Sequence, residues 1–224
     1  MLKFDPENLF PVLESNFSFD LAARDHSKKV DAFLGLDVES IEQLLRESKI
    51  LCDRETWKHS DPQVFLTPYV ELRFILELLK PRAFETIVDI GAAYCRMAFV
   101  IEKHFPDVLF RGYEFVSARV AEAQRLFVLN NFRRSKVECR DVNHVEFKLL
   151  PEEYYFIYDF GSRTEISSFL TRMQNLHGTG KSFTLIARGN RVRDCVEGEH
   201  RKWLHKSVQL PRNCEFAIYA CTML

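Results

Sequence analysis

Paired cysteines and glycine-rich stretches are both missing from this sequence. Its 6 cysteines are scattered without a Cys-x-x-Cys pair, and only 8 of its 224 residues are glycine. The scatter argues against a zinc ribbon or a disulfide framework, so we expect reduced and mostly buried thiols. Cys195, His200 and His205 recur at five-residue intervals. On a helix that spacing turns successive side chains to different faces, so no metal site is predicted.

Long hydrophobic runs are also missing. No stretch reaches the roughly 18 consecutive apolar residues that identify a membrane-spanning helix. The N-terminal sequence, MLKFDPENLF, has neither the basic start nor the apolar stretch of a secretory signal. We therefore expect a cytoplasmic protein without a membrane partner.

The sequence also lacks an excess of positive or negative charge. The 31 Lys and Arg residues nearly balance the 32 Asp and Glu residues, which gives a formal net charge of −1. Such a balance gives no electrostatic support for a nucleic-acid partner. Acidic residues are in excess before residue 87 and basic residues after it. That asymmetry fits an anionic partner and also fits ordinary surface variation, so nucleic acid stays an open alternative.

Apolar residues are numerous enough for a full core. They make up 46% of the sequence, which contains 20 phenylalanines. Near-helical spacing of leucine and isoleucine over residues 36–51, with Ser40 as a cap, predicts a helix. A second amphipathic run, YVELRFILELLK, ends before Pro81. We divide the chain into an N-terminal helical cap, residues 1–64, and a main domain, residues 65–224.

From Thr86 onward, short apolar runs alternate with longer amphipathic stretches. The runs TIVDIG, VLFRGYEF, KVECRDV, YYFIYDFG and SFTLIARG read as strands, and two further strand-like runs flank residues 211–213. Strands that alternate with helices are typical of parallel βαβ units. We predict an α/β, Rossmann-like three-layer sandwich. Its seven-stranded sheet is mostly parallel and ends in an antiparallel strand, and the N-terminal helices lie beside it.

The loop after the first predicted strand is the best candidate for a binding site. In doubly wound folds, ligands lie where the carboxyl ends of strands meet the amino ends of helices. Gly91 follows the apolar run IVDI, whereas Ala93 and Cys95 occupy positions where a dinucleotide-binding loop would carry glycine. A pyrophosphate ligand is therefore disfavoured. Asp89 would also repel a phosphate and attract an ammonium group, which indicates a cationic or zwitterionic ligand.

The segment VDIGAAYCR resembles the acid-x-Gly-x-Gly-x-Gly motif of class I S-adenosylmethionine-dependent methyltransferases, especially its bacterial variety. The run FLTPYVELRFILELL is similar to the helix that precedes this motif, with a fainter likeness to non-SET histone-lysine methyltransferases. The resemblance implies that residues 65–224 bind S-adenosyl-L-methionine through a loop containing Asp89, Gly91, Ala92 and Ala93. The sequence departs from the motif at Ala93 and Cys95.

Two further strand ends carry acidic residues at suitable spacing. Glu114 ends the second predicted strand, where a carboxylate can accept hydrogen bonds from both ribose hydroxyls. In the resembled family the ribose-binding acid occupies this place. The resemblance also implies that Asp141 accepts from the adenine amine, that the Val142 N–H reads adenine N1, and that Phe115 packs on the ring. A simple turn-forming role for Asp141 stays an alternative.

The end of the fourth predicted strand, YYFIYDFGS, carries the candidate catalytic residue Asp159. This run loosely resembles the (Asn/Asp)-Pro-Pro-(Tyr/Phe) motif of methyltransferases that act on amino groups, but both prolines are missing. Asp159 would orient the methyl acceptor or act as a general base. Holding the cofactor is the alternative role.

The predicted function is that of an S-adenosylmethionine-dependent methyltransferase. The acceptor is unknown, with a protein side chain or a small amine favoured. One alternative is a degenerate, non-catalytic interaction module in which Ala93 and Cys95 block the methionine moiety. A nicotinamide-dependent Rossmann enzyme is a further alternative, disfavoured by the missing glycines and by Asp89.

Overall fold

The computed structural model describes residues 2–13, 21–48, 61–177, 180–210 and 214–221. Helices form the N-terminal part, and strands alternate with helices from Thr86 onward. The elements are α1 (Leu21–Leu34), α2 (Val38–Ser48), α3 (Pro62–Phe65), α4 (Tyr69–Leu79), β1 (Thr86–Ile90), α5 (Arg96–His104), β2 (Leu109–Glu114), α6 (Ser117–Leu129), β3 (Ser135–Cys139), β4 (Tyr154–Tyr158), α7 (Arg163–His177), β5 (Thr184–Arg188), α8 (Asn190–Cys195), the π-helical turn η1 (Val196–His200), β6 (Leu204–Lys206) and β7 (Phe216–Cys221).

The strands form one seven-stranded sheet in the order β3-β2-β1-β4-β5-β7-β6. The first five of these strands run parallel to one another, and β7 runs antiparallel to both β5 and β6. This arrangement confirms the predicted Rossmann-like fold with an antiparallel strand near its end. Since β1, β2 and β3 are parallel neighbours, their carboxyl ends lie at the same edge of the sheet.

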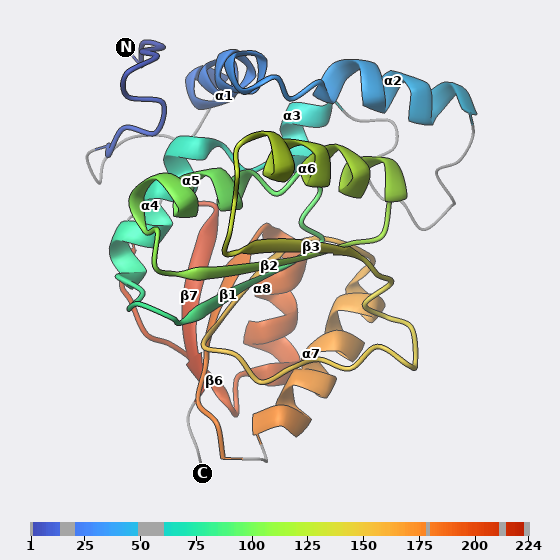
Figure 1. The fold of residues 1–224 in the computed structure, drawn as a ribbon. Coiled ribbons are helices and arrows are strands. Elements are labelled where there is room, and N and C mark those ends of the chain that lie inside the picture. Colours follow the sequence, from blue (N-terminus) through green and yellow to red (C-terminus); the bar gives the residue numbers. More distant parts are fainter. Residues whose placement is uncertain (1, 14–20, 49–60, 178–179, 211–213, 222–224) are drawn as a thin grey trace.

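Helices cover both faces of the sheet, with α4, α5 and α6 on one face and α7 and α8 on the other (Figure 1). Each face has its own cluster of buried apolar residues. The cluster beneath α4–α6 also contains Phe10, Val30 and Val38 from the N-terminal part. The helices α1 and α2 lie outside this helical layer (Figure 1). The division of the chain at residue 64 stays a prediction.

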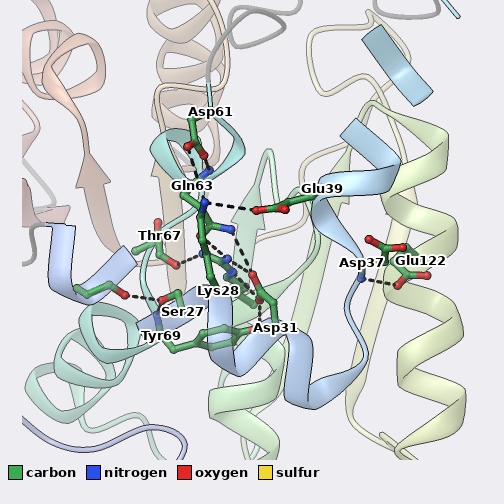
Figure 2. Close-up of polar contacts among 12 residues, drawn as sticks. Ser27, Lys28, Asp31, Asp37, Glu39, Asp61, Gln63, Thr67, Tyr69 and Glu122 are labelled. Atoms are coloured by element: carbon green, nitrogen blue, oxygen red, sulfur yellow. Dashed lines mark hydrogen bonds and ion pairs between the residues drawn. The ribbon is translucent and has the colours of Figure 1, made fainter. Parts of the chain in front are cut away.

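A buried ion pair attaches α1 to the start of α5. The Arg96 guanidinium pairs with the Asp31 carboxylate, and both side chains are buried. Asp31 also accepts from the Tyr69 hydroxyl at 2.9 Å, and Arg96 donates to the Gln63 side-chain oxygen at 2.8 Å. Figure 2 shows Asp31, Gln63 and Tyr69 pointing toward one another. A buried charge is tolerated when it is paired and hydrogen-bonded, as Arg96 is here.

One local prediction differs from the structure. The cap of α2 is Asp37, whose carboxylate accepts from the Ser40 N–H at 3.2 Å, so Ser40 lies inside the helix. The stretch after β5 forms α8, η1 and β6, and it buries Val196 and Trp203 in the core of that face.

No helix within the described ranges is long and apolar enough to cross a membrane. Among the same residues, no group of three or more His, Cys, Asp and Glu side chains is arranged to hold a metal ion. The cytoplasmic location stays a prediction.

Candidate functional site

Three alternate residues of the loop between β1 and α5 have left-handed backbone conformations. The φ angles are 76° at Gly91, 46° at Ala93 and 56° at Cys95. These are the three glycine positions of the resembled motif, so the loop adopts a glycine-type conformation even where glycine is replaced. A residue with a Cβ in this conformation costs roughly 1–2 kcal/mol. The replacements therefore strain the loop at two positions.

Gly91 is also required by a close approach between two strand ends. A Cβ added to Gly91 would lie 2.7 Å from Cβ of Phe160, which follows β4. Atoms that close overlap, and the positive φ at this position adds strain for any other residue. Glycine therefore lets the loops after β1 and β4 meet.

Cys95 fits beneath the loop because the neighbouring residue on β2, Gly112, has no side chain. A Cβ added to Gly112 would lie 3.0 Å from the Cys95 Sγ and 3.0 Å from the Ala92 Cβ. The thiol is fully buried against this strand. Burial, and then the charges of Asp89 and Glu114, raises the pKa of the Cys95 thiol. The thiol thus fills space beneath the loop and does not line the cleft described next.

A cleft opens at the carboxyl ends of β1, β2 and β3 and contains about 700 Å³ of empty space, including the part open to solvent. The lining residues are Phe65, Gly91, Ala93, Tyr113, Glu114, Phe115, Arg119, Arg140, Asp141, Val142, Asn143, Tyr158, Phe160 and Glu165. The structure thus brings together these predicted cofactor residues: Gly91, Ala93, Glu114, Phe115, Asp141 and Val142.

Glu114 ties the glycine-type loop to the start of α6. Its carboxylate accepts from the Ala93 N–H at 2.9 Å and from the Val116 N–H at 2.8 Å. Nη1 of Arg119 lies 3.7 Å from the same carboxylate. Glu114 therefore joins the loop and α6 at the edge of the cleft that it lines.

Asp141 and Val142 follow β3 in a segment without regular secondary structure. The Asp141 carboxylate accepts from the Asn143 N–H at 2.9 Å, which forms an Asx turn. The turn predicted as an alternative role is therefore present, and the same side chain lines the cleft. Val142 is buried.

Asp89 and Ala92 line an adjoining pocket with about 330 Å³ of empty space, including the part open to solvent. It shares Gly91, Ala93 and Tyr158 with the main cleft. Burial, followed by the nearby charge of Glu114, raises the pKa of Asp89 to about 8. The predicted acidic residues therefore divide between two connected spaces, with Glu114 and Asp141 in one and Asp89 in the other.

The Asp159 carboxylate caps the first turn of α8 and lines neither cavity. It accepts from the Val192 N–H at 2.9 Å and from the Arg191 N–H at 3.3 Å. Gly189 permits this approach, because an added Cβ there would lie 2.4 Å from the carboxylate. Phe160, the next residue, does line the cleft. The catalytic role of Asp159 stays a prediction.

The sequence reasoning missed the buried arginine of this cleft. Arg119 donates to the Glu42 carboxylate on α2 at 2.7 Å and 3.1 Å, and its guanidinium lies 4.9 Å from the centre of the Phe65 ring. Glu42 also accepts from the Tyr94 hydroxyl at 2.7 Å. Periodicity gives no signal for such pairs, because the partners lie far apart in sequence.

No protein-family model matches the chain, and no curated protein matches its sequence. The fold is similar to that of TrmN from Thermus thermophilus, with a TM-score of 0.53 and 12% identity over 71% of this chain. That match spans about half, 49%, of the TrmN chain.

Two further solved structures are matched over nearly their whole length. PH0226 from Pyrococcus horikoshii OT3 has a TM-score of 0.52 and 10% identity, over 79% of this chain and 98% of that one. A human methyltransferase 10 domain containing protein has a TM-score of 0.50 and 14% identity, over 83% of this chain and 98% of that one. At such identities the likeness concerns the fold. The chain therefore shares the Rossmann-like fold of these three proteins.

Proposed function

We propose that the chain binds S-adenosyl-L-methionine and is an S-adenosylmethionine-dependent methyltransferase. One observation carries the proposal. The carboxylates of Glu114 and Asp141, from the ends of neighbouring strands, line the same cleft as Gly91 and Ala93. Ribose hydroxyls and an adenine amine are donors that two such carboxylates would bind.

The adenosyl part of the ligand would lie in the main cleft. Glu114 would accept from the ribose hydroxyls, Asp141 would accept from the adenine amine, and the Val142 N–H would donate to adenine N1. Phe115 is 46% exposed and lines the cleft, where its ring would pack on the base. The hydrogen-bonding groups of the cleft therefore suit an adenosyl group.

The amino-acid part of the ligand would lie toward Asp89. This carboxylate is buried in the adjoining pocket. A ligand ammonium group would favour its ionised form and compensate the cost of burial. Ala93 lines both spaces, so the ligand would pass along its backbone from one to the other.

Methyl transfer requires little covalent help from the chain, because the sulfonium of the bound cofactor supplies an already activated methyl group. The chain's residues would bind the cofactor, orient the acceptor and exclude water. Tyr158 and Phe160 line the cleft beside Gly91 and are suited to exclude water there. The proposed acceptor is a protein side chain or a small amine, and nucleic acid is the alternative. The likenesses to the bacterial motif and to histone-lysine methyltransferases stay predictions.

Isothermal titration with S-adenosylhomocysteine tests the proposal directly. Wild-type protein should bind, and Glu114→Gln should weaken binding about tenfold or more, because charge-assisted hydrogen bonds to the ribose are lost. Glu47→Gln on α2 is a matched control, since it makes the same change at an exposed site. A folded wild-type protein that binds no S-adenosylhomocysteine would contradict the proposal.

The degenerate-module alternative remains worth testing because of the substitutions at Ala93 and Cys95. The position of the Cys95 thiol against Gly112 favours an open cleft over a blocked one. The double variant Ala93→Gly with Cys95→Gly distinguishes a functional cofactor site from a degenerate one. Binding that appears only in the doubly restored variant would indicate a decayed site. Fluorescence titration with NADH tests the nicotinamide alternative.

A further inference from the structure

We propose that Arg172 of α7 is a positioning residue for adenine recognition, acting through the segment 141–147. The inference rests on the proposed function, because it assigns Arg172 a role only if Asp141 and Val142 read an adenine ring. Arg172 itself is not among the residues that line the cleft.

The guanidinium of Arg172 bridges the two ends of this segment. Nη1 donates to the Val142 carbonyl at 2.6 Å, and Nη2 donates to the Phe147 carbonyl. The same guanidinium lies 5.6 Å from the centre of the Phe147 ring. The planar fork of arginine suits two acceptors held side by side, whereas lysine presents a single ammonium group.

The planarity of one peptide group links the Arg172 contact at Val142 to the side chain of Asp141. The Val142 carbonyl and the Asn143 N–H belong to the same planar peptide group, so holding the carbonyl fixes the direction of the N–H. That N–H donates to the Asp141 carboxylate at 2.9 Å. Arg172 therefore sets the orientation of the carboxylate that would accept from the adenine amine.

Residues 141–147 form turns and bends and belong to no helix or strand. Their own backbone contributes turn hydrogen bonds, from the His144 N–H to the Asp141 carbonyl and from the Phe147 N–H to the His144 carbonyl, both at 3.0 Å. Tyr113 packs edge-on against Phe147 with 4.9 Å between ring centres. These contacts shape the turn, and Arg172 attaches it to α7.

The preference for adenine over another base tests whether Arg172 positions the adenine-reading groups or only stabilises the fold. S-inosylhomocysteine replaces the adenine amine by a carbonyl oxygen and the N1 acceptor by an N–H donor, so both contacts of the segment become mismatched. Wild-type protein should prefer S-adenosylhomocysteine over S-inosylhomocysteine by about tenfold or more in isothermal titration. Arg172→Met should reduce that preference to roughly threefold or less, because the carboxylate is no longer held.

Two further variants complete the experiment, with thermal unfolding used to check that each is folded. Arg172→Lys keeps the charge but loses the fork, and we expect it to reduce the preference as well. Arg163→Met on the same helix is the control, because its side chain is 60% exposed and pairs with Glu199. It should leave the preference unchanged.

The failure of this inference can be distinguished from failure of the proposed function. Wild-type protein that binds neither compound overturns both. Wild-type binding without base preference overturns the adenine-reading role and the inference together. Loss of affinity for both compounds in Arg172→Met and Arg172→Lys, with the preference retained, overturns positioning and leaves the cofactor site intact.

Discussion

Glu42 on α2 and Arg119 on α6 form a bidentate ion pair beside the cleft, with N–O distances of 2.7 Å and 3.1 Å. Both side chains are almost fully buried. Arg119 also lies 3.7 Å from the proposed ribose-binding residue Glu114. The N-terminal helix α2 thus supplies the carboxylate that balances the charge of Arg119, which lies between α2 and the proposed cofactor site.

Removing the Glu42 carboxylate should destabilise the fold strongly. We expect Glu42→Ala to lower the free energy of unfolding by about 3–5 kcal/mol, because Arg119 would lose a buried partner. Replacing both residues, in Glu42→Leu with Arg119→Met, should cost clearly less than the sum of the single changes. Urea unfolding measures each value, with Gln43→Ala as the exposed control on the same helix. Glu42→Ala within about 0.5 kcal/mol of wild type would contradict the assigned pairing.

The strained loop predicts opposite effects for two neighbouring alanines. Ala93 has a φ of 46°, whereas Ala92 is not among the residues with positive φ. Ala93→Gly should leave stability unchanged or raise it by up to about 1 kcal/mol, since relief of strain offsets the greater freedom of the unfolded chain. Ala92→Gly should lower stability by about 0.5–1 kcal/mol or more. Thermal unfolding of the two variants gives the comparison, and equal losses would argue against a left-handed conformation at Ala93.

The sequence predicted the fold and six of the 14 residues that line the cleft, because both follow from local patterns. Apolar runs alternating with amphipathic stretches specify parallel βαβ units, and parallel strands place Glu114 and Asp141 at one edge without further information. Gly91 was recognisable because it directly follows a buried strand.

Side-chain direction and long-range pairing were not predictable in the same way. Asp159 follows a strand as Glu114 ends one, but the approach of Gly189 turns its carboxylate to the amino end of α8. Glu42 and Arg119 meet only when α2 and α6 come together in the fold. The spacing of apolar residues within each helix does not predict that contact. Ser40 and Asp37 are both good capping residues, and sequence alone does not decide where the turn begins.

A capping role for Asp159 predicts a loss of stability in its alanine variant. Asp159→Ala should lower the free energy of unfolding by about 1–2 kcal/mol, because two N–H groups of α8 lose their acceptor. Affinity for S-adenosylhomocysteine should change little, since the side chain lines neither cavity. Asp194→Ala, at an exposed position on α8, is the control. Unchanged stability together with lost methyl transfer would instead support the catalytic role.

The buried carboxylate of Asp89 predicts a pH dependence of stability. Burial, then the charge of Glu114, raises its pKa from 3.8 to about 8 in the folded protein. Between about pH 4 and pH 8, folded Asp89 therefore retains a proton that the unfolded chain has lost. This group's contribution to stability is full below pH 4 and is lost as the pH rises toward 8, by at most about 1.4 kcal/mol per pH unit.

Asp89→Asn tests this linkage, because an amide of similar shape cannot titrate. We expect the variant to remove that negative slope and to be more stable than wild type near pH 8, where ionisation of the buried group is costly. Asp25→Asn, at an exposed site on α1, should leave the slope as in wild type. The measurement is urea unfolding at several pH values between 5 and 9. If Asp89→Asn and wild type show parallel pH profiles, the side chain is ionised throughout this range, and the cavity must already supply a compensating positive charge or hydrogen-bond donors.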